Sequence, residues 1–204
     1  MPIEVLESYK PDISEDQANW WLQGLGAQDK DNEIIGLTIM TLYRKPATMF
    51  DVGSGTGCMV NVWRANGIEA YGVDRLPRQA WPHLFTADLT KPFRVNMQFD
   101  FVSCIEVSEH LPESAAETLL DTIYLLMKPR GMLFFTSAQP GQRGEGHINM
   151  QFAEYWRERL DKRGVIYRDC ATFRTMLALR AMDHPQRHIE ANLQMFQKQD
   201  EQIS

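Results

Sequence analysis

The 204-residue sequence has no long hydrophobic run and no excess of basic residues. No apolar stretch approaches the ~18 residues that a membrane-spanning helix requires. The net charge of -6 and the pI of about 5.4 are the opposite of the basic composition expected for a nucleic-acid-binding domain. These absences argue against a membrane span and a nucleic-acid partner, and the length fits one globular domain.

Cysteine is also scarce. The three cysteines are far apart, and each lies in or beside an apolar segment: Cys58, Cys104 and Cys170. None has CxxC spacing, so the sequence indicates neither a metal knuckle nor a disulfide framework. We expect buried, reduced thiols, as in the reducing cytosol. The first twelve residues, MPIEVLESYKPD, lack the basic and apolar regions of a signal peptide, which also favours a cytoplasmic location.

The most informative stretch is residues 47–57, with the sequence ATMFDVGSGTG. Its first half is the apolar run of a short buried strand, with Asp51 near the end. Three glycines follow at alternate positions: Gly53, Gly55 and Gly57. Residues 58–66 then have helical character. A strand, a glycine-rich turn and a helix start together indicate a nucleotide-binding turn, because glycine lets a ligand approach the main chain.

The glycine spacing distinguishes between kinds of nucleotide-binding turn. A dinucleotide fingerprint, GxGxxG, requires a glycine where this sequence has Cys58, and a phosphate-binding loop requires a lysine after the last glycine. Asp51 stands two residues before Gly53. Its carboxylate is a poor neighbour for a pyrophosphate and a good one for a cationic or amine-bearing ligand.

Apolar runs alternate with helical patterns, which is typical of a parallel sheet covered on both faces. We expect strands at 49–52, 69–73, 84–87, 98–105, 132–136, 165–169 and 191–198, and helices at 14–25, 29–43, 58–66, 113–127, 149–163 and 171–181. For 191–198 a helix fits nearly as well, and 128–131 reads as a turn. We interpret residues 1–204 as a single domain, with 1–45 as a helical cap or flank and 46–199 as the core.

Acidic residues stand at or near the carboxyl ends of four successive expected strands: Asp51, Asp74, Asp88 and Glu106. Ligands of parallel α/β sheets bind beyond these strand ends. We therefore expect the four acids to surround one binding site.

Together these features resemble the class I S-adenosylmethionine (SAM)-dependent methyltransferases. Asp51 with its GxGxG loop resembles the first motif of that family, GVD ending at Asp74 resembles its ribose-binding acid, and FDFVSCIEVSEHLP at 99–112 resembles its fourth motif. The resemblance covers residues 30–198. It implies a single-domain, Rossmann-like three-layer α/β/α sandwich, with a mostly parallel seven-stranded sheet and a final antiparallel strand. It also implies SAM as cofactor, S-adenosylhomocysteine as product and no metal.

The resemblance further implies which residues bind the cofactor. Asp74 would accept hydrogen bonds from the ribose hydroxyls, Asp88 would bind the adenine amine, and Asp51 would hold the methionine ammonium directly or through water. The other cofactor residues would be Gly53, Ser54, Gly55, Arg75, Leu89, Glu106 and Val107. Each acid also has a purely structural interpretation: a helix cap or turn for Asp74, an Asx-turn for Asp88 and a strand-end acid for Asp51.

Two histidines are candidate catalytic residues. His147 lies in GQRGEGHIN, which resembles a loop of methyltransferases from sugar and small-molecule pathways, and an imidazole can accept a proton near neutral pH. His110 follows Glu109 within the fourth motif. Either histidine could instead brace its loop.

The sequence thus predicts methyl transfer from SAM to a small-molecule acceptor, with O-methylation of a sugar or glycan intermediate ahead of N-methylation. A catalytically inactive SAM-binding module or partner subunit of the same fold stays an alternative. A nicotinamide-dependent oxidoreductase is disfavoured by the glycine spacing. Both a monomer and a homodimer are compatible with the sequence.

Overall fold

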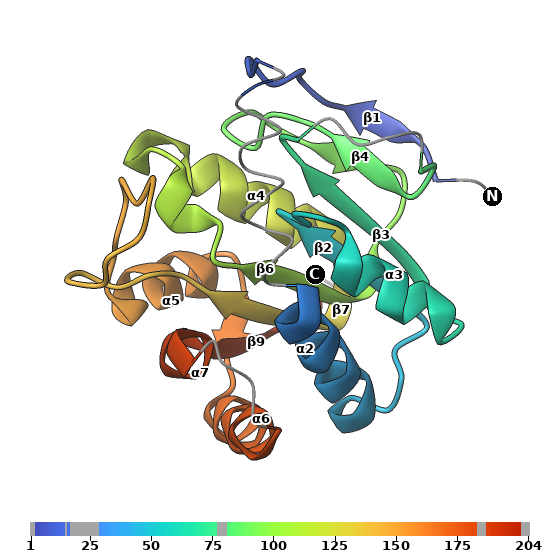
Figure 1. Ribbon diagram of the computed structural model, residues 1–204, viewed down its shortest axis with the longest axis vertical. Helices are drawn as coiled ribbons and strands as arrows, with labels where there is room; N and C mark the ends of the chain where they lie inside the picture. Colours follow the sequence, from blue (N-terminus) through green and yellow to red (C-terminus); the bar gives the residue numbers. More distant parts are fainter. Residues whose placement is uncertain (1–2, 15, 17–28, 77–80, 183–186, 201–204) are drawn as a thin grey trace.

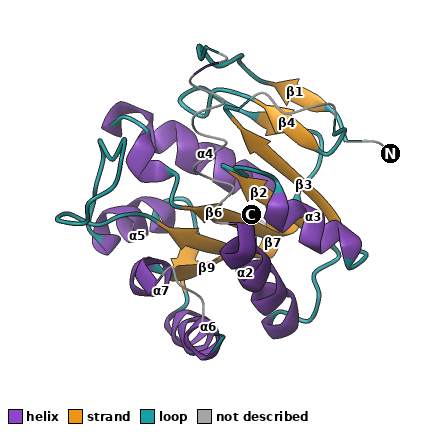
Figure 2. Ribbon diagram, viewed as in Figure 1, coloured by secondary structure: helices purple, strands orange, loops and turns teal. Residues whose placement is uncertain are grey.

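The structure is a computed structural model, and it describes residues 3–14, 16, 29–76, 81–182 and 187–200. A seven-stranded sheet in the order β4-β3-β2-β6-β7-β9-β8 lies between helices on both faces (Figures 1 and 2). Its strands are β2 (Thr48–Val52), β3 (Glu69–Asp74), β4 (Leu84–Thr86), β6 (Phe99–Ile105), β7 (Met127–Thr136), β8 (Val165–Tyr167) and β9 (Gln194–Lys198).

The sheet is parallel from β4 through β3, β2 and β6 to β7. Strand β9 pairs antiparallel with both β7 and β8, so it alone runs in the opposite direction. The structure therefore confirms the predicted three-layer sandwich with a mostly parallel sheet and a final antiparallel strand.

Helices cover the two faces of the sheet as separate layers (Figure 2). On one face lie α2 (Asp29–Leu42), α3 (Cys58–Ala65), α6 (Asp169–Ala181) and α7 (Arg187–Asn192). On the other lie α4 (Ala116–Leu126) and α5 (Ala153–Asp161), preceded by the 3-10 turns η1 (Ser108–His110) and η2 (Glu113–Ala115).

Successive strand residues contribute to two different cores. On β2, Met49 packs in the cluster beneath α2 and α3, whereas Phe50 packs in the cluster beneath α4. On β7, Phe134 packs in the cluster beneath α2 and α3, and Phe135 packs in the cluster beneath α4. Because neighbouring side chains of a strand point to opposite faces, a sheet buried on both faces needs continuous apolar runs. The apolar runs in the sequence are explained by this arrangement.

Lys198, the last residue of β9, is buried beside the end of α4. Its ammonium group donates hydrogen bonds to the carbonyl oxygens of Tyr124 at 3.1 Å and Met127 at 3.0 Å. Carbonyl groups at the end of a helix have no partner within the helix, and a cation there also interacts favourably with the helix dipole. The last strand thereby fixes the end of α4.

Strand β7 is longer than the sequence predicts. Lys128–Gly131 was expected to be a turn before the strand, but Met127 already pairs with Phe99, and Met132 pairs with Phe101. The intervening residues bulge out of the ladder, and Arg130 has a φ of 62°. The chain does turn here, as Pro-Arg-Gly suggests, but the turn lies within a continuous strand.

Helix α5 begins at Ala153, four residues later than expected. Asn149, the first residue of the expected helix, is instead buried in the preceding loop, and its amide donates to the carbonyl oxygen of Ser108. Helix α7 and a small antiparallel sheet formed by β1 (Val5–Glu7) and β5 (Arg94–Val95) were not predicted. Elements this short carry too little periodicity to be identified from sequence. The expected helix with Trp20 and Trp21 lies almost entirely outside the described residues.

The three cysteines are free thiols. Cys104 is buried and Cys58 is half-buried, but the prediction of burial is wrong for Cys170, which is exposed in the first turn of α6. Within the described part of the chain, no helix combines the length and apolarity needed to cross a bilayer. The division of the chain into a flank at 1–45 and a core at 46–199 stays a prediction.

Gly72 of β3 provides a test of how tightly the glycine loop is packed on the sheet. An added Cβ would lie 2.7 Å from Cβ of Ser54 and 3.0 Å from a methyl group of Val60. We expect Gly72→Ala to lower the free energy of unfolding by about 1–3 kcal/mol, the usual effect of overpacking. Urea denaturation measures this change. An unchanged midpoint would contradict the prediction, because it would show that the loop moves to accommodate the added methyl group at no cost in stability.

Candidate functional site

A cavity of about 1040 Å³ lies at the carboxyl ends of β2, β3, β4 and β6. Its wall contains every residue that the sequence assigned to cofactor binding or catalysis: Asp51, Gly53, Ser54, Gly55, Asp74, Arg75, Asp88, Leu89, Glu106, Val107, His110 and His147. This is the sheet edge at which open α/β folds bind ligands. The structure thus brings these residues together, and the binding role of each stays a prediction.

Backbone contacts hold the glycine loop after β2. The N–H groups of Gly53 and Ser54 donate to the carbonyl oxygen of Val73, at 2.8 and 3.0 Å. Gly53 has a φ of +78°, and a Cβ on it would lie 2.2 Å from a methyl group of Val107. Both observations require glycine, so the loop presents bare backbone to the cavity.

The Asp74 carboxylate joins the glycine loop to the end of β3. One oxygen accepts a hydrogen bond from the N–H of Gly55 and the other from the N–H of Leu76, each at 2.9 Å. Each carboxylate oxygen can accept more than one hydrogen bond. Asp74 can therefore keep its hydrogen bonds to the N–H groups of Gly55 and Leu76 and also accept one from a hydroxyl group of a ligand.

Asp88 forms the Asx-turn that the sequence analysis gave as its structural interpretation. Its Oδ1 accepts hydrogen bonds from the backbone N–H and the hydroxyl of Thr90, at 2.9 and 2.7 Å. Its own N–H donates to the carbonyl oxygen of Tyr9 at 2.7 Å, which brings the N-terminal segment to the rim of the cavity. Leu89 beside it is buried in the wall.

Asp51 is only 4 % exposed, and its Oδ1 accepts a hydrogen bond of 2.6 Å from the Ser103 hydroxyl. Burial raises the pKa of Asp51 to about 7, against the lowering effect of Ser103 and with a smaller raising effect of Asp74. Burial has this effect because a low-dielectric surrounding disfavours the charged form. A cation in the cavity would stabilise that charged form.

Glu109 is a functional candidate that the sequence identified only as part of a motif. Its side chain is fully buried and its Oε1 accepts a hydrogen bond from the N–H of Ala138. Its carbonyl oxygen accepts from the N–H groups of Ile148 and Asn149, at 2.8 and 3.1 Å. Burial, followed by the charge of Glu106, raises the pKa of Glu109 to about 8. These contacts fix the loop after β7 on η1.

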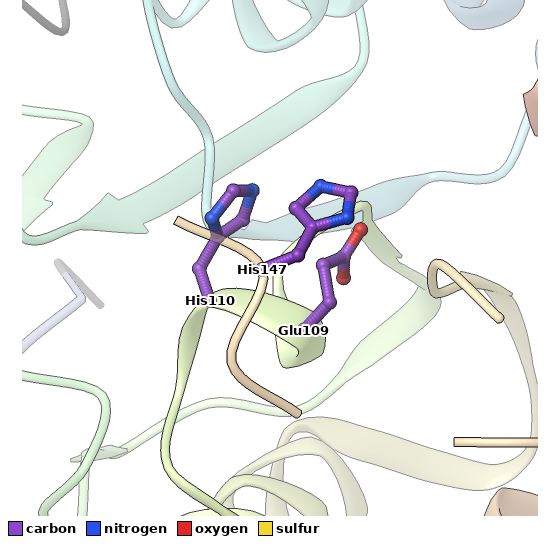
Figure 3. Close-up of side chains that lie close together, drawn as sticks. All are labelled: Glu109, His110 and His147. Carbon is purple, nitrogen blue, oxygen red and sulfur yellow. The ribbon is translucent and has the colours of Figure 1, made fainter. Parts of the chain in front are cut away.

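His110 and His147 face each other across this contact, with ring centroids 5.0 Å apart (Figure 3). Nδ1 of His110 lies 3.2 Å from the carbonyl oxygen of Gly146. Burial, and then the neighbouring His147, lower the pKa of His110, so its ring is neutral at physiological pH. The two candidate catalytic residues are therefore brought together in the structure.

Three segments contribute wall residues that the sequence did not predict. His188 comes from α7, Asn32 from α2 and Asp12 from the N-terminal segment. The side chain of Asn192 fixes α7 to the site by donating to Gln142 at 2.9 Å and to Glu106 at 3.3 Å. The sequence signal was absent because His188 belongs to no motif and α7 has only six residues.

Comparisons with known proteins identify the family and the fold of this chain. A family described as "Methyltransferase domain" matches residues 32–182. The sugar N-methyltransferase KedS8 from Streptoalloteichus sp ATCC 53650 superposes with a TM-score of 0.66 at 15% sequence identity, over 95% of this chain and 97% of that chain. At this identity the likeness shows the fold.

Two further solved structures share the fold. The Burkholderia thailandensis 1,6-didemethyltoxoflavin-N1-methyltransferase, crystallised with 1,6-didemethyltoxoflavin and S-adenosylhomocysteine, gives a TM-score of 0.58 at 13% identity, over 97% of this chain and 95% of that chain. The [4+2]-cyclase SpnF gives 0.52 at 16% identity, over 95% and 86%. Comparison with curated protein sequences gave no match.

The raised pKa of Asp51 predicts how stability depends on pH. Because the folded-state pKa is about 7, against ~3.9 in an unfolded chain, ionising Asp51 destabilises the fold progressively from about pH 4 to pH 7. Asp51→Asn removes this effect. We expect the stability of the variant relative to the original protein to rise by about 1–3 kcal/mol between pH 5 and pH 8. Urea denaturation across this range measures it, and a pH-independent difference would contradict it.

Proposed function

This chain belongs to the class I, SAM-dependent methyltransferase family, and on that premise we propose that it transfers a methyl group from SAM to a small-molecule acceptor. The observation that carries the proposal is the convergence of Asp51, Asp74 and the glycine loop on one cavity. SAM presents a cationic ammonium and sulfonium together with two ribose hydroxyls. A buried acid, a hydrogen-bond-accepting acid and bare backbone are complementary to these groups.

The proposed cofactor position follows the strand ends. The adenine lies between Asp88 and Leu89, the ribose hydroxyls meet Asp74, and the methionine end extends along the glycine loop to Asp51. The transferred methyl group then faces Glu106 and Val107. The distribution of these residues along one wall supports this pose.

The acceptor occupies the other end of the cavity, beside the loop after β7 and helix α7. That end is lined by polar groups, including Gln142, Arg143, Glu145, His147 and His188. Such a wall suits a hydroxylated acceptor, and we propose O-methylation of a sugar or glycan intermediate. KedS8 shows that this fold is compatible with a sugar acceptor in another protein.

The reaction requires alignment more than chemical assistance. The acceptor oxygen attacks the methyl carbon in line with the sulfur, the C–S bond breaks, and its electrons stay on sulfur, giving neutral S-adenosylhomocysteine. The hydroxyl proton must leave the acceptor. His147 and His110 stand at the acceptor end to assist its removal.

A second candidate function is SAM binding without methyl transfer. The cyclase SpnF shares the fold, so the fold alone does not establish the reaction. Activity separates the two. We expect labelled methyl groups from SAM to be incorporated into hydroxylated sugars, and incorporation into amines at a higher rate would redirect the proposal to N-methylation. Tight SAM binding with no transfer across an acceptor screen would favour the binding module.

Cofactor binding is tested at Asp74. We expect Asp74→Ala to weaken SAM binding by about ten- to a hundredfold, because hydrogen bonds to a charged group are worth ~1.5–3 kcal/mol. Calorimetry with SAM, S-adenosylhomocysteine and NAD measures it. Asp161→Ala serves as the control, since Asp161 is exposed at the end of α5, outside the cavity wall. Equal affinities for the two variants would remove Asp74 from the cofactor site.

A further inference from the structure

Three side chains with metal-binding groups meet at the acceptor end of the cavity (Figure 3). Glu109 and His110 lie on η1, and His147 lies in the loop after β7. One ligand atom from each lies within 4.8 Å of those from the other two. Ligands that share one ion at ~2.0–2.2 Å are about 3–4 Å apart, so small side-chain rotations suffice to bring these atoms to a common ion.

Two of these groups have buried atoms that lack a hydrogen bond. Oε2 of Glu109 and Nδ1 of His147 are both buried, and no donor or acceptor among the described residues pairs with either in a standard hydrogen bond; the group beside the Glu109 carboxyl is a second carboxyl, that of Glu106. Glu109 is 0 % exposed, so solvent does not reach its carboxyl group. Buried charges in proteins are normally paired or coordinate metal ions. The geometry thus points to a ligand that is bound by both side chains.

The electrostatics of this cluster favour a cation. Glu106 lies beside Glu109 and lines the same cavity as His110 and His147, so a second acid adjoins the cluster.

We propose that Glu109, His110 and His147 bind a divalent first-row transition-metal ion. Two imidazoles and one carboxylate form a typical ligand set for Zn²⁺ or Fe²⁺, and carboxylates also suit Mn²⁺. Three protein ligands leave coordination positions open toward the cavity, as in catalytic metal sites. The family resemblance implies no metal, and this proposal departs from that expectation on the geometry of these three side chains.

The role of the ion rests on the proposed function. A hydroxyl oxygen bound to a divalent cation loses its proton more readily, and here the proton passes to solvent water. The oxygen then uses its electron pair to form the bond to the methyl carbon, while the C–S bond breaks and its electrons remain on sulfur. With the ion bound, His110 and His147 are its ligands, and the metal takes over the assistance to proton removal that the proposed function gives to the two histidines.

Metal binding can be measured independently of activity. The full-length protein is stripped with a chelator, dialysed and titrated calorimetrically with Zn²⁺, Mn²⁺ or Mg²⁺, with elemental analysis for stoichiometry. We expect one Zn²⁺ or Mn²⁺ per chain, bound more tightly than Mg²⁺. Losing an outer-shell partner already weakens metal affinity about 10–100-fold, so His110→Ala and His147→Ala should each weaken it at least tenfold.

Two further variants make this test specific. His83→Ala is the matched control, because His83 lies outside the cavity wall and its ring nitrogen contacts Asn61. Glu109→Gln keeps the volume of the buried side chain and an oxygen for the N–H of Ala138, but removes the charge. We expect Glu109→Gln to weaken metal binding as the histidine variants do, with a circular dichroism spectrum like that of the original protein.

The outcomes separate this proposal from the proposed function. S-adenosylhomocysteine affinity is measured on the same samples, and we expect it to be unchanged in His147→Ala. If the protein binds the metal but not S-adenosylhomocysteine, the proposed function fails and the metal site stands. If no divalent ion binds with one-to-one stoichiometry, or if the His110 and His147 variants bind it as tightly as His83→Ala, the metal site is overturned.

Discussion

The burial of carboxyl groups at one edge of a parallel sheet is the constraint on which the rest of the structure depends. Parallel strands end at the same edge, so the acids that follow β2, β3 and β6 share one cavity. Asp51 and Glu109 are almost completely buried there, and burial is the main reason that the pKa of each is raised, to about 7 and about 8. Burial therefore favours the neutral form of both carboxyl groups, and a cation beside either one would favour its ionised form. The site is complementary to positive charge at two places, one beside the glycine loop and one beside the loop after β7.

The parts of the structure that sequence predicts are those with a strong local signal. The apolar runs of β2, β6 and β7 reflect burial on both faces, and the glycine pattern reflects a backbone conformation that Gly53 must adopt. Acids at strand ends then converge because parallel strands share an edge. The sheet and the location of the candidate site follow from these few residues, while the contacts that each residue makes with a ligand stay predictions.

The parts that sequence did not predict depend on how the chain is routed in space. Glu109 and His147 lie close together because the N–H groups of Ile148 and Asn149 donate to the carbonyl oxygen of Glu109 and fix the loop on η1. The spacing of residues in the sequence does not predict this contact. His188 reaches the cavity on a six-residue helix held by Asn192. The bulge that includes Arg130 likewise appears only through its pairing with β6. Tertiary contacts of this kind are invisible to local periodicity.

The position of β9 has a consequence for the order in which the protein forms. This strand follows β8 in the chain but lies between β7 and β8 in the sheet. During translation, β8 is therefore synthesised before the strand that joins it to the sheet, and one side of β7 stays open until residues 194–198 leave the ribosome. Unpaired strand edges of nascent chains are prone to association. The interval before β9 inserts is thus the period in which this edge of β7 can associate with another chain.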